Sequence, residues 1–297
     1  MISTTARLRW LRNRSAVAIP SKSARGLALA LGLVRSWIAF ALPLLAILLG
    51  WEMLVRAGAI QSSILPAPST IVARAVELLQ PSDPLHSVLL AHILKSVSRA
   101  LTAFLFAVFV AVPLGFALGL SETLRDWLSA LISLLLPLPA VAWAPILLVA
   151  LGQGDATIVI VCFLGAVFPV LYSTIQGVQG VSEKSLWVLR SMGASHRDLF
   201  FRALLPATIP TIMTGLKLGI AHSWRTLVAA EMLAAMNFGL GQMIFAARTF
   251  MDTATMFVGI FCLAILGMVV EQGLFVPLEA ATVRKWYGAT RSGGGNR

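Results

Sequence analysis

Long apolar stretches alternate with short polar ones along most of the chain. A helix that crosses a membrane needs about 20 consecutive apolar residues. Six segments reach or approach this length, at approximately residues 36–55, 99–120, 128–151, 156–175, 211–236 and 254–276. The pattern therefore predicts an all-α integral membrane protein with about six transmembrane helices.

Proline occurs repeatedly within or beside these apolar segments, for example at Pro137, Pro139 and Pro169. Membrane helices tolerate proline because neighbouring helices can satisfy the carbonyl groups that it frees. The prolines favour a bundle whose helices bend around a pathway, although ordinary helix packing would also accommodate them. Before the second segment, residues 69–80 are predicted to form a short amphipathic helix with Ser69 as its N-cap.

Composition supports a membrane protein. The chain has 297 residues, of which 58% are hydrophobic and 12% charged, and its mean hydropathy is +0.88. A soluble domain has about 25% charged residues. The formal net charge of +11 could suggest nucleic-acid binding, but the basic residues lie mainly at the ends of apolar segments, in the N-terminal tail and in one loop. Membrane topology requires that distribution.

The distribution of lysine and arginine predicts the orientation in the membrane. If six helices cross and the N-terminus is inside, sixteen basic residues lie on the inner side and five on the outer side. Basic residues concentrate on the cytoplasmic side of membrane proteins, so both termini are predicted to be cytoplasmic. The first 35 residues, with seven basic and no acidic residues, fit either a cytoplasmic tail or an organellar transit peptide.

The sequence shows no cluster of residues that predicts catalysis. The four histidines are scattered, and no phosphate-binding loop or metal-ligand motif is present. Cys162 and Cys262 lie within apolar segments, where small buried side chains are a simpler interpretation than a disulfide or a metal site. We therefore expect a protein that is not an enzyme and that has no catalytic residues, cofactor or metal site.

The fifth apolar segment carries His222, Arg225 and Thr226 near its middle, and Glu231 further on. Ionisable groups at membrane depth often mark functional sites because they are costly to bury. His222, Arg225 and Glu231 are therefore candidates for residues of a transport pathway, in which Arg225 would attract an anion. Alternatively, Arg225 forms a structural pair with a buried acid or carbonyl group of another helix. Glu231 follows Arg225 by six positions, so the two should not face each other on a straight helix.

A basic loop separates the fourth and fifth apolar segments. It carries four basic residues, among them Arg190 and Arg197, together with Gly193. The positive-inside rule places such a loop in the cytoplasm, where its helical pattern indicates a docking surface. Residues 189–201 are predicted to form a short helix, and Gly193 to allow another backbone to approach closely.

The loop resembles the cytoplasmic signature of binding-protein-dependent ABC-transporter permeases, which runs E-A-A, three residues, Gly, nine residues and I-x-L-P. Here nine residues separate Gly193 from residues 203–206, which read A-L-L-P. The E-A-A positions fall on residues 187–189, which read W-V-L, and Ala203 stands where isoleucine is usual. The resemblance implies that the loop docks a cytoplasmic ATPase through Arg190, Gly193, Ala194, Ser195, Arg197, Leu205 and Pro206.

Further motifs resemble the nitrate/sulfonate/taurine-type branch of these permeases. They are LPAPS at residues 65–69, P-x-x-x-x-G-L at 210–216, LVAAEML at 227–233 and GLG at 239–241. Together the resemblance extends over about residues 60–287.

This resemblance implies a type I ABC importer permease fold and a subunit of the bacterial inner membrane. Two copies of the chain would form the pathway for a small anion such as an alkanesulfonate, taurine or nitrate. The implied partners are two copies of an ABC ATPase, a periplasmic or lipoprotein substrate-binding protein and membrane lipid, without nucleic acid. The alternative is an ion-driven secondary transporter or channel, which would need a relay of intramembrane carboxylates.

The resemblance also divides the chain into parts. A basic cytoplasmic tail covers residues 1–35, and the first transmembrane helix with the external helix covers residues 36–91. The type-1 transmembrane core covers residues 92–278 and contains a cytoplasmic coupling loop at residues 176–210. A cytoplasmic C-terminal tail covers residues 279–297.

Overall fold

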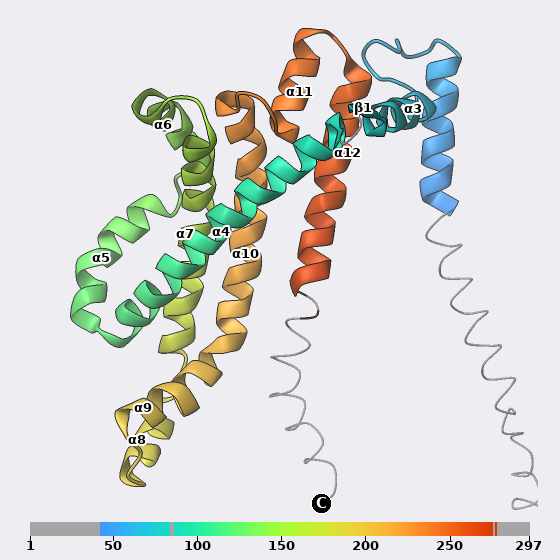
Figure 1. The fold of residues 1–297 in the computed structure, drawn as a ribbon. Helices are drawn as coiled ribbons and strands as arrows, with labels where there is room; N and C mark the ends of the chain where they lie inside the picture. Colours follow the sequence, from blue (N-terminus) through green and yellow to red (C-terminus); the bar gives the residue numbers. More distant parts are fainter. Residues whose placement is uncertain (1–41, 84–85, 276, 278–297) are drawn as a thin grey trace, which may run out of the picture. The chain divides into compact units, whose positions relative to one another are not determined.

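The structure is a computed structural model, and it describes residues 42–83, 86–275 and 277. These residues are helical almost throughout (Figure 1). The predicted cytoplasmic tails at residues 1–35 and 279–297 lie outside the described residues.

The chain divides by its contacts into two units, residues 1–62 and residues 63–297. In the first unit, residues 42–56 form a helix that overlaps the first predicted transmembrane segment. The second unit is built of helices and a short antiparallel pair of strands, β1 (Pro81–Asp83) and β2 (His86–Ser87).

The second unit begins with the amphipathic helix α3 (Pro68–Leu79), whose buried face carries Ile71. The helix predicted at residues 69–80 is confirmed, but its predicted N-cap is wrong. Proline occupies the first turn, where its missing N–H leaves no hydrogen bond unmade, and Ser69 lies inside the helix.

Three long helices form the centre of this unit: α4 (Val88–Leu120), α7 (Asp155–Gln179) and α10 (Leu205–Ala234). Helix α7 packs against both α4 and α10. Glycine makes the contact close, because a Cβ on Gly115 of α4 would lie only 2.6 Å from the Cβ of Thr174 on α7. Small residues at such contacts let membrane helices pack tightly.

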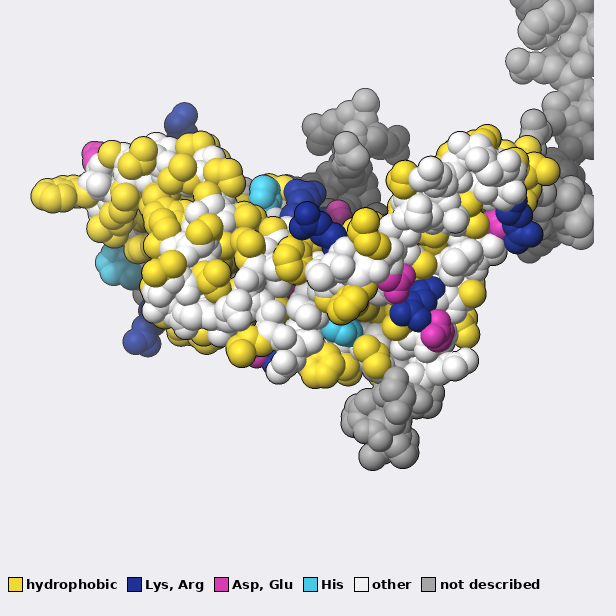
Figure 2. Space-filling view, turned by 90° about the horizontal axis from the view of Figure 1, so that it is seen from above, with side chains coloured by type: hydrophobic (Ala, Val, Ile, Leu, Met, Phe, Trp, Pro, Cys, Tyr) yellow, Lys and Arg dark blue, Asp and Glu magenta, His cyan; other side chains and the backbone are white. Residues whose placement is uncertain are grey.

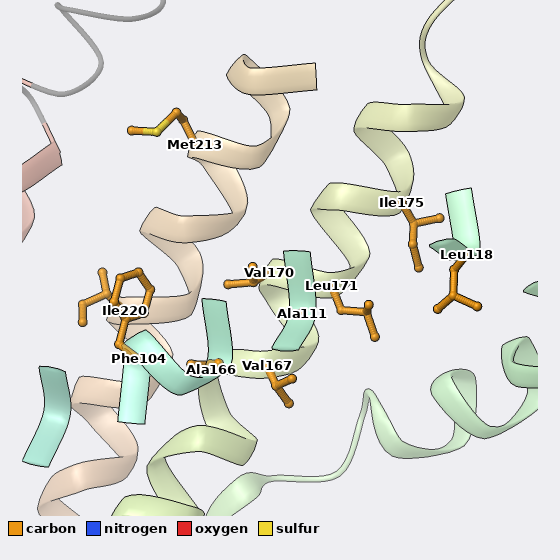
Figure 3. Close-up of a cluster of buried hydrophobic side chains, with 11 residues drawn as sticks. Phe104, Ala111, Leu118, Ala166, Val167, Val170, Leu171, Ile175, Met213 and Ile220 are labelled. Atoms are coloured by element: carbon orange, nitrogen blue, oxygen red, sulfur yellow. The ribbon is translucent and has the colours of Figure 1, made fainter. Parts of the chain in front are cut away.

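A hydrophobic core lies between the three helices (Figure 3). Its buried side chains are Phe104, Ala107, Ala111 and Leu118 from α4, Ala166, Val167, Val170, Leu171 and Ile175 from α7, and Met213 and Ile220 from α10. Because these side chains interlock, enlarging one of them would cost about 1–3 kcal/mol.

Helix α4 begins well before the second predicted segment, which starts at residue 99. The early part of the helix carries His92, Ser96 and Arg99, which are buried on one face. Their polar side chains lower the local hydropathy, so a search for apolar runs places the start of the helix too late.

Helices α5 (Glu122–Leu135) and α6 (Ala144–Leu151) replace the single helix predicted at residues 128–151. The sequence LPLP at residues 136–139 interrupts it, because proline cannot donate a hydrogen bond within a helix and clashes with the preceding turn. A 3-10 helix, η1 (Ala140–Trp143), leads into α6, and the two arms meet at 87°.

The last part of the described chain holds α11 (Leu240–Thr249) and α12 (Thr253–Val270), which continues into a π-helical turn, η3 (Glu271–Phe275). The sixth predicted segment, residues 254–276, corresponds to α12 and η3. Helix α11 was not predicted, because it is too short to register as a membrane span.

Four helices of the described residues are long and apolar enough to cross a membrane, or five if the bent pair counts as one span. The predicted six also includes the segment at residues 36–55, of which residues 36–41 lie outside the described residues.

The connection from α7 to α10 contains α8 (Glu183–Ser191), α9 (His196–Asp198) and a π-helix, η2 (Leu199–Leu204), which runs directly into α10. The single helix predicted at residues 189–201 is wrong, because a turn at Gly193 divides it. Figure 1 shows α8 and α9 near one end of α10 and α11 near the other.

Candidate functional sites

A group of charged side chains lies buried where α4, α7 and α10 meet the start of α11. Arg99 is at its centre: Nε and Nη2 donate to Asp155 Oδ1 at 2.9 and 2.7 Å, and Nη1 donates to Glu231 Oε1 at 2.8 Å. Nη1 also donates to the Phe238 carbonyl at 2.6 Å. Arg99 is 4% exposed and Glu231 is not exposed at all, so each charge is compensated inside the protein. We call Arg99, Glu231, Asp155, Lys95, Ser96 and His92 the charge cluster.

Glu231 is saturated with hydrogen bonds. Besides Arg99, its carboxylate accepts from the hydroxyl of Ser96, whose Oγ lies 2.9 Å from both carboxylate oxygens, and from the Gly241 N–H at 2.9 Å. The Ser96 hydroxyl in turn accepts from the Leu240 N–H at 2.8 Å. The link from α10 to α11 is therefore held to α4 through side chains.

Two features of that link require glycine. Gly239 has a φ of +148°, and a Cβ there would lie 2.7 Å from Arg99 Nη1 and from the Glu231 carboxylate. His92 Nδ1 lies 2.8 Å from the Gly239 carbonyl oxygen and 3.0 Å from its nitrogen, so the imidazole donates or accepts according to its tautomer. The backbone of Gly239 thus lies directly against the charge cluster, in space that a larger residue would need for its side chain.

The charge cluster reaches the surface through an ion pair between Lys95 Nζ and Asp155 Oδ2 at 2.6 Å. These two side chains are 40% and 51% exposed. Figure 2, seen from the α11 end, shows basic and acidic side chains beside one another on this face. Arg99 and Lys95 therefore balance the charges of Glu231 and Asp155. The Arg99–Glu231 pair is buried, and the Lys95–Asp155 pair is partly exposed to solvent.

Sequence reasoning missed this arrangement. It grouped Glu231 with His222 and Arg225, whereas the structure joins Glu231 to Arg99 on another helix. The prediction that Arg225 and Glu231 do not face each other agrees with this placement. The available signal was the spacing of His92, Ser96 and Arg99, which lie four and three positions apart and so share one helix face.

The same face of the unit holds a second ion pair. Arg74 of α3 bonds Asp252 Oδ2 at 3.0 Å and the Thr255 hydroxyl at 2.9 Å, which ties α3 to the first turn of α12. Asp252 caps that turn by accepting from the Thr255 N–H at 3.0 Å. Partial burial alone would raise the pKa of Asp252, but its bonds from Thr255 and the charge of Arg74 outweigh burial and lower it.

The coupling loop has a tightly defined turn at Gly193. The Ala194 N–H donates to the Leu189 carbonyl at 3.1 Å and the Gly193 N–H to the Arg190 carbonyl at 2.9 Å, which is the Schellman motif that ends α8. Gly193 has a φ of +85°, and no atom would lie within 4 Å of a Cβ there. The backbone conformation therefore favours glycine here. Close approach by the backbone of a docked protein at Gly193 stays a prediction.

A second local cap follows the turn. The Asp198 N–H donates to Ser195 Oγ at 3.2 Å, and the Ser195 hydroxyl donates to Asp198 Oδ2 at 2.6 Å. Arg202 Nε lies 3.3 Å from Asp198 Oδ1. These bonds join residues three or four positions apart, so they are local to the coupling loop. The π-helix η2 that follows is packed on the bundle, where Phe200 and Leu204 contact Phe116 of α4.

The predicted docking residues fall into two groups. Arg190, Gly193, Ser195 and Arg197 are exposed on the coupling loop, and Ala194 is half-buried beside them. Leu205 and Pro206 are half-buried in the first turn of α10. Exposed apolar side chains surround the first group, with Trp187 65% and Met192 78% exposed. Their role in docking stays a prediction.

His222 lines a groove of about 550 Å³ beside the break between α5 and α6. Arg225 lines a different, smaller cavity of about 90 Å³, together with Trp224, Gly267 and Glu271. Trp224 Nε1 donates to the Leu263 carbonyl at 3.1 Å, which fixes this side of α10 against α12. The structure therefore separates the three candidate pathway residues into a groove, a cavity and the charge cluster.

Known proteins resemble this chain over most of its length. The profile of the family described as binding-protein-dependent transport system inner membrane component matches residues 111–273, from within α4 to η3. The taurine transport system permease protein TauC of Escherichia coli is 32% identical over 245 residues, which cover 82% of this chain and 88% of TauC. The nitrate import permease protein NrtB of Synechocystis is 30% identical over 249 residues, covering 80% and 89%.

The fold also matches a solved structure. A chain from the inward facing conformations of the MetNI methionine ABC transporter superimposes with a TM-score of 0.58. The match covers 68% of this chain and 99% of that one, at 18% identity. It indicates a shared arrangement of helices and says nothing of the substrate.

Proposed function

The chain belongs to the family of binding-protein-dependent transport system inner membrane components, and from this premise we propose that it forms the translocation pathway for a small anion such as taurine, an alkanesulfonate or nitrate. It is a permease of an ABC importer of the taurine/sulfonate/nitrate type, with the type I fold, and its relatives are transport proteins rather than enzymes. The choice of an anion rests on what the relatives are named for.

The observation that carries the proposed mechanism is the continuity between the coupling loop and α10. The turn at Gly193 and the cap at Ser195 hold the coupling loop by local hydrogen bonds, and η2 runs directly into α10 with no residue between them. A displacement of the coupling loop would therefore move α10, which carries His222 and Arg225. Such rigid-body movement is a common means of switching between states.

The proposed partners follow from this design. Two ABC ATPases would dock on the coupling loops of two copies of this chain, through Arg190, Arg197 and the exposed side chains beside them. A periplasmic or lipoprotein substrate-binding protein would deliver the anion at the opposite side of the membrane. An ion-driven transporter would need a carboxylate free to exchange protons, whereas Glu231 is held by Arg99 and two further donors.

Reconstitution tests the proposed function. The chain, its ATPase and its binding protein in liposomes should import a labelled small anion only with ATP inside. The result that would contradict the anion is import of a cation, or of a neutral solute without an anionic group, in place of butanesulfonate, nitrate and taurine. Taurine counts with the anions through its sulfonate, although it also carries an ammonium group.

We propose that the N-terminus and the C-terminus both lie on the cytoplasmic side of the membrane. Reporter fusions at Gln80 and Gly193 should report opposite sides of the inner membrane, with Gly193 in the cytoplasm. A cytoplasmic signal at Gln80 would overturn this orientation.

A further inference from the structure

The groove at His222 differs from the other cavities in the chemistry of its walls. It lies between the LPLP break with η1, one face of α7 and one face of α10. Its walls are apolar apart from His222 and Thr226: they include Leu138, Leu164, Phe168 and Leu218. A cavity with a few polar groups among apolar walls is the usual form of a small-molecule site.

We propose that this groove is a substrate subsite of the pathway that binds an amphipathic organic anion, a short alkanesulfonate, by its head at His222 and Thr226 and by its chain along the apolar walls. The inference rests on the proposed function and names the kind of anion. It predicts that the permease itself, and not only the binding protein, distinguishes an alkanesulfonate from an inorganic anion.

The two polar side chains are placed to receive one head group. His222 and Thr226 are four residues apart on α10, so they lie one above the other on the same face. An imidazole N–H and a hydroxyl both donate hydrogen bonds, and a sulfonate has three oxygens that accept them. Gly165 of α7 also lines the groove, and a Cβ there would lie 2.9 Å from Thr226 Oγ1, so α7 lies close to α10 at the Thr226 hydroxyl.

The apolar walls provide the second half of the recognition. Leu138 is 45% and Leu218 48% exposed, so both present surface that an alkyl chain could cover. Burying one methylene group strengthens binding by about fourfold. Nitrate has no chain and gains nothing from these walls, so its binding to the groove should be weaker.

The groove also suits a site that must release its ligand. Among the residues that the structure describes, no lysine or arginine lines it, since Arg225 lines the other cavity, so the head group meets only His222 and Thr226 as side-chain donors. A pathway site has to bind strongly enough to admit a substrate and weakly enough to let it leave.

Thiol protection tests the subsite in the assembled transporter. Cys162 and Cys262 are first replaced by alanine, and Leu218→Cys is introduced, with uptake by the wild-type chain and by the variant measured in parallel. Methane-, ethane- and butanesulfonate should slow labelling of Leu218→Cys at concentrations that fall about fourfold for each added methylene. Nitrate should protect least. Leu138→Cys, in the break between α5 and α6, is the second position to test if the Leu218→Cys protein does not reach the membrane.

A matched control separates the groove from a general effect. Ile260→Cys on α12 is 47% exposed, close to the 48% of Leu218, and lies outside the groove. Its labelling should not change with any sulfonate. Adding His222→Leu to Leu218→Cys should weaken protection by every sulfonate, whereas Thr226→Ser, which keeps the hydroxyl, should not.

Three results would overturn the subsite. They are equal protection at Ile260→Cys, protection that does not depend on chain length, and a thiol at both Leu218 and Leu138 that never reacts because a second copy or lipid covers it. If the wild-type chain still imports the anion with ATP in any of these cases, only the subsite fails. If no anion is imported, the proposed function fails instead.

Discussion

The charge cluster and the coupling loop hold ionised side chains in opposite ways. In the charge cluster, Arg99 and Glu231 are buried and bonded to partners more than a hundred positions away in the sequence. In the coupling loop, Asp198 and Arg202 are bonded to neighbours within four positions and remain largely solvated. The charge cluster therefore depends on the packing of several helices, whereas the polar bonds of the coupling loop are local and leave most of its charged side chains facing solvent.

This difference matches what each region would do in a transporter. Removing one partner from a buried pair leaves an uncompensated charge, which destabilises a protein by about 3–5 kcal/mol. Exposed pairs contribute about 0–1 kcal/mol. Changes to Arg99 or Glu231, the buried pair of the charge cluster, should thus reduce the amount of folded protein, and changes in the coupling loop should reduce coupling.

Arg99→Met should have the largest effect, because it leaves Glu231 buried without its cation. We expect the free energy of unfolding to fall by about 3–5 kcal/mol, measured by thermal unfolding in detergent and by the amount of protein in the membrane. Lys95→Met is the control, since that pair is exposed and should contribute at most about 1 kcal/mol.

A double variant sharpens this test. Arg99→Met combined with Glu231→Leu removes both buried charges, so it should be more stable than Arg99→Met alone. A double variant as unstable as the sum of its parts would show that packing, not charge, dominates at this position.

Replacing one glycine in each region compares the charge cluster with the coupling loop directly. Gly239→Ala places a Cβ 2.7 Å from Arg99 Nη1 at a φ of +148°, so strain and overpacking together should destabilise the protein by about 2–4 kcal/mol. Gly193→Ala meets no neighbour and should cost only about 1–2 kcal/mol of backbone strain. If thermal unfolding shows that both variants lose the same free energy of unfolding, the distinction between the two regions is wrong.

Gly193→Trp should leave the protein in the membrane but disturb the coupling loop. A distortion worth about 1–2 kcal/mol would weaken ATPase docking by about 5- to 30-fold. Uptake should fall while ATP hydrolysis continues without transport. Gly193→Asn is the matched variant, because asparagine tolerates this conformation, and it should keep more of the uptake. Normal transport by the Gly193→Trp protein would contradict the hypothesis that this turn docks the ATPase.

Arg225→Gln should have the smallest effect on stability, at most about 1 kcal/mol, because Arg225 is exposed. If it attracts the anion, uptake should fall at an unchanged protein level. A parallel fall in protein and uptake would instead support a structural pair, for which Glu271 lies in the same cavity. A normal protein level with normal uptake would contradict both the anion-attracting role and the structural pair.

The sequence predicted those parts of the molecule whose signal is local. Apolar runs identified the long central helices, although α10 begins at Leu205 and not at the predicted residue 211. The break at residues 136–139 was visible as two prolines, yet their effect depends on whether neighbouring helices can hold the chain straight. Periodicity alone does not decide that.

The charge cluster could not be predicted in the same way. Arg99 meets Glu231 only because α4 and α10 both pack against α7, and the sequence does not state which helices are neighbours. Glu231 appeared as an isolated acid in an apolar segment, which made it a candidate pathway residue. His92, Ser96 and Arg99 carried the missing signal, since a polar stripe on an apolar helix indicates a partner.

The π-helix η2 has a consequence for how this junction could change in length. A π-helix holds more residues per turn than an α-helix, so residues 199–204 contain a spare residue relative to a regular helix. Deleting one residue there would let the segment return to α-helical bonding with the faces of α10 still aligned to α8. The same deletion in the middle of α10 would rotate everything before it by about 100°. The junction is thus the point at which this chain could lose one residue without misaligning the two segments that it connects.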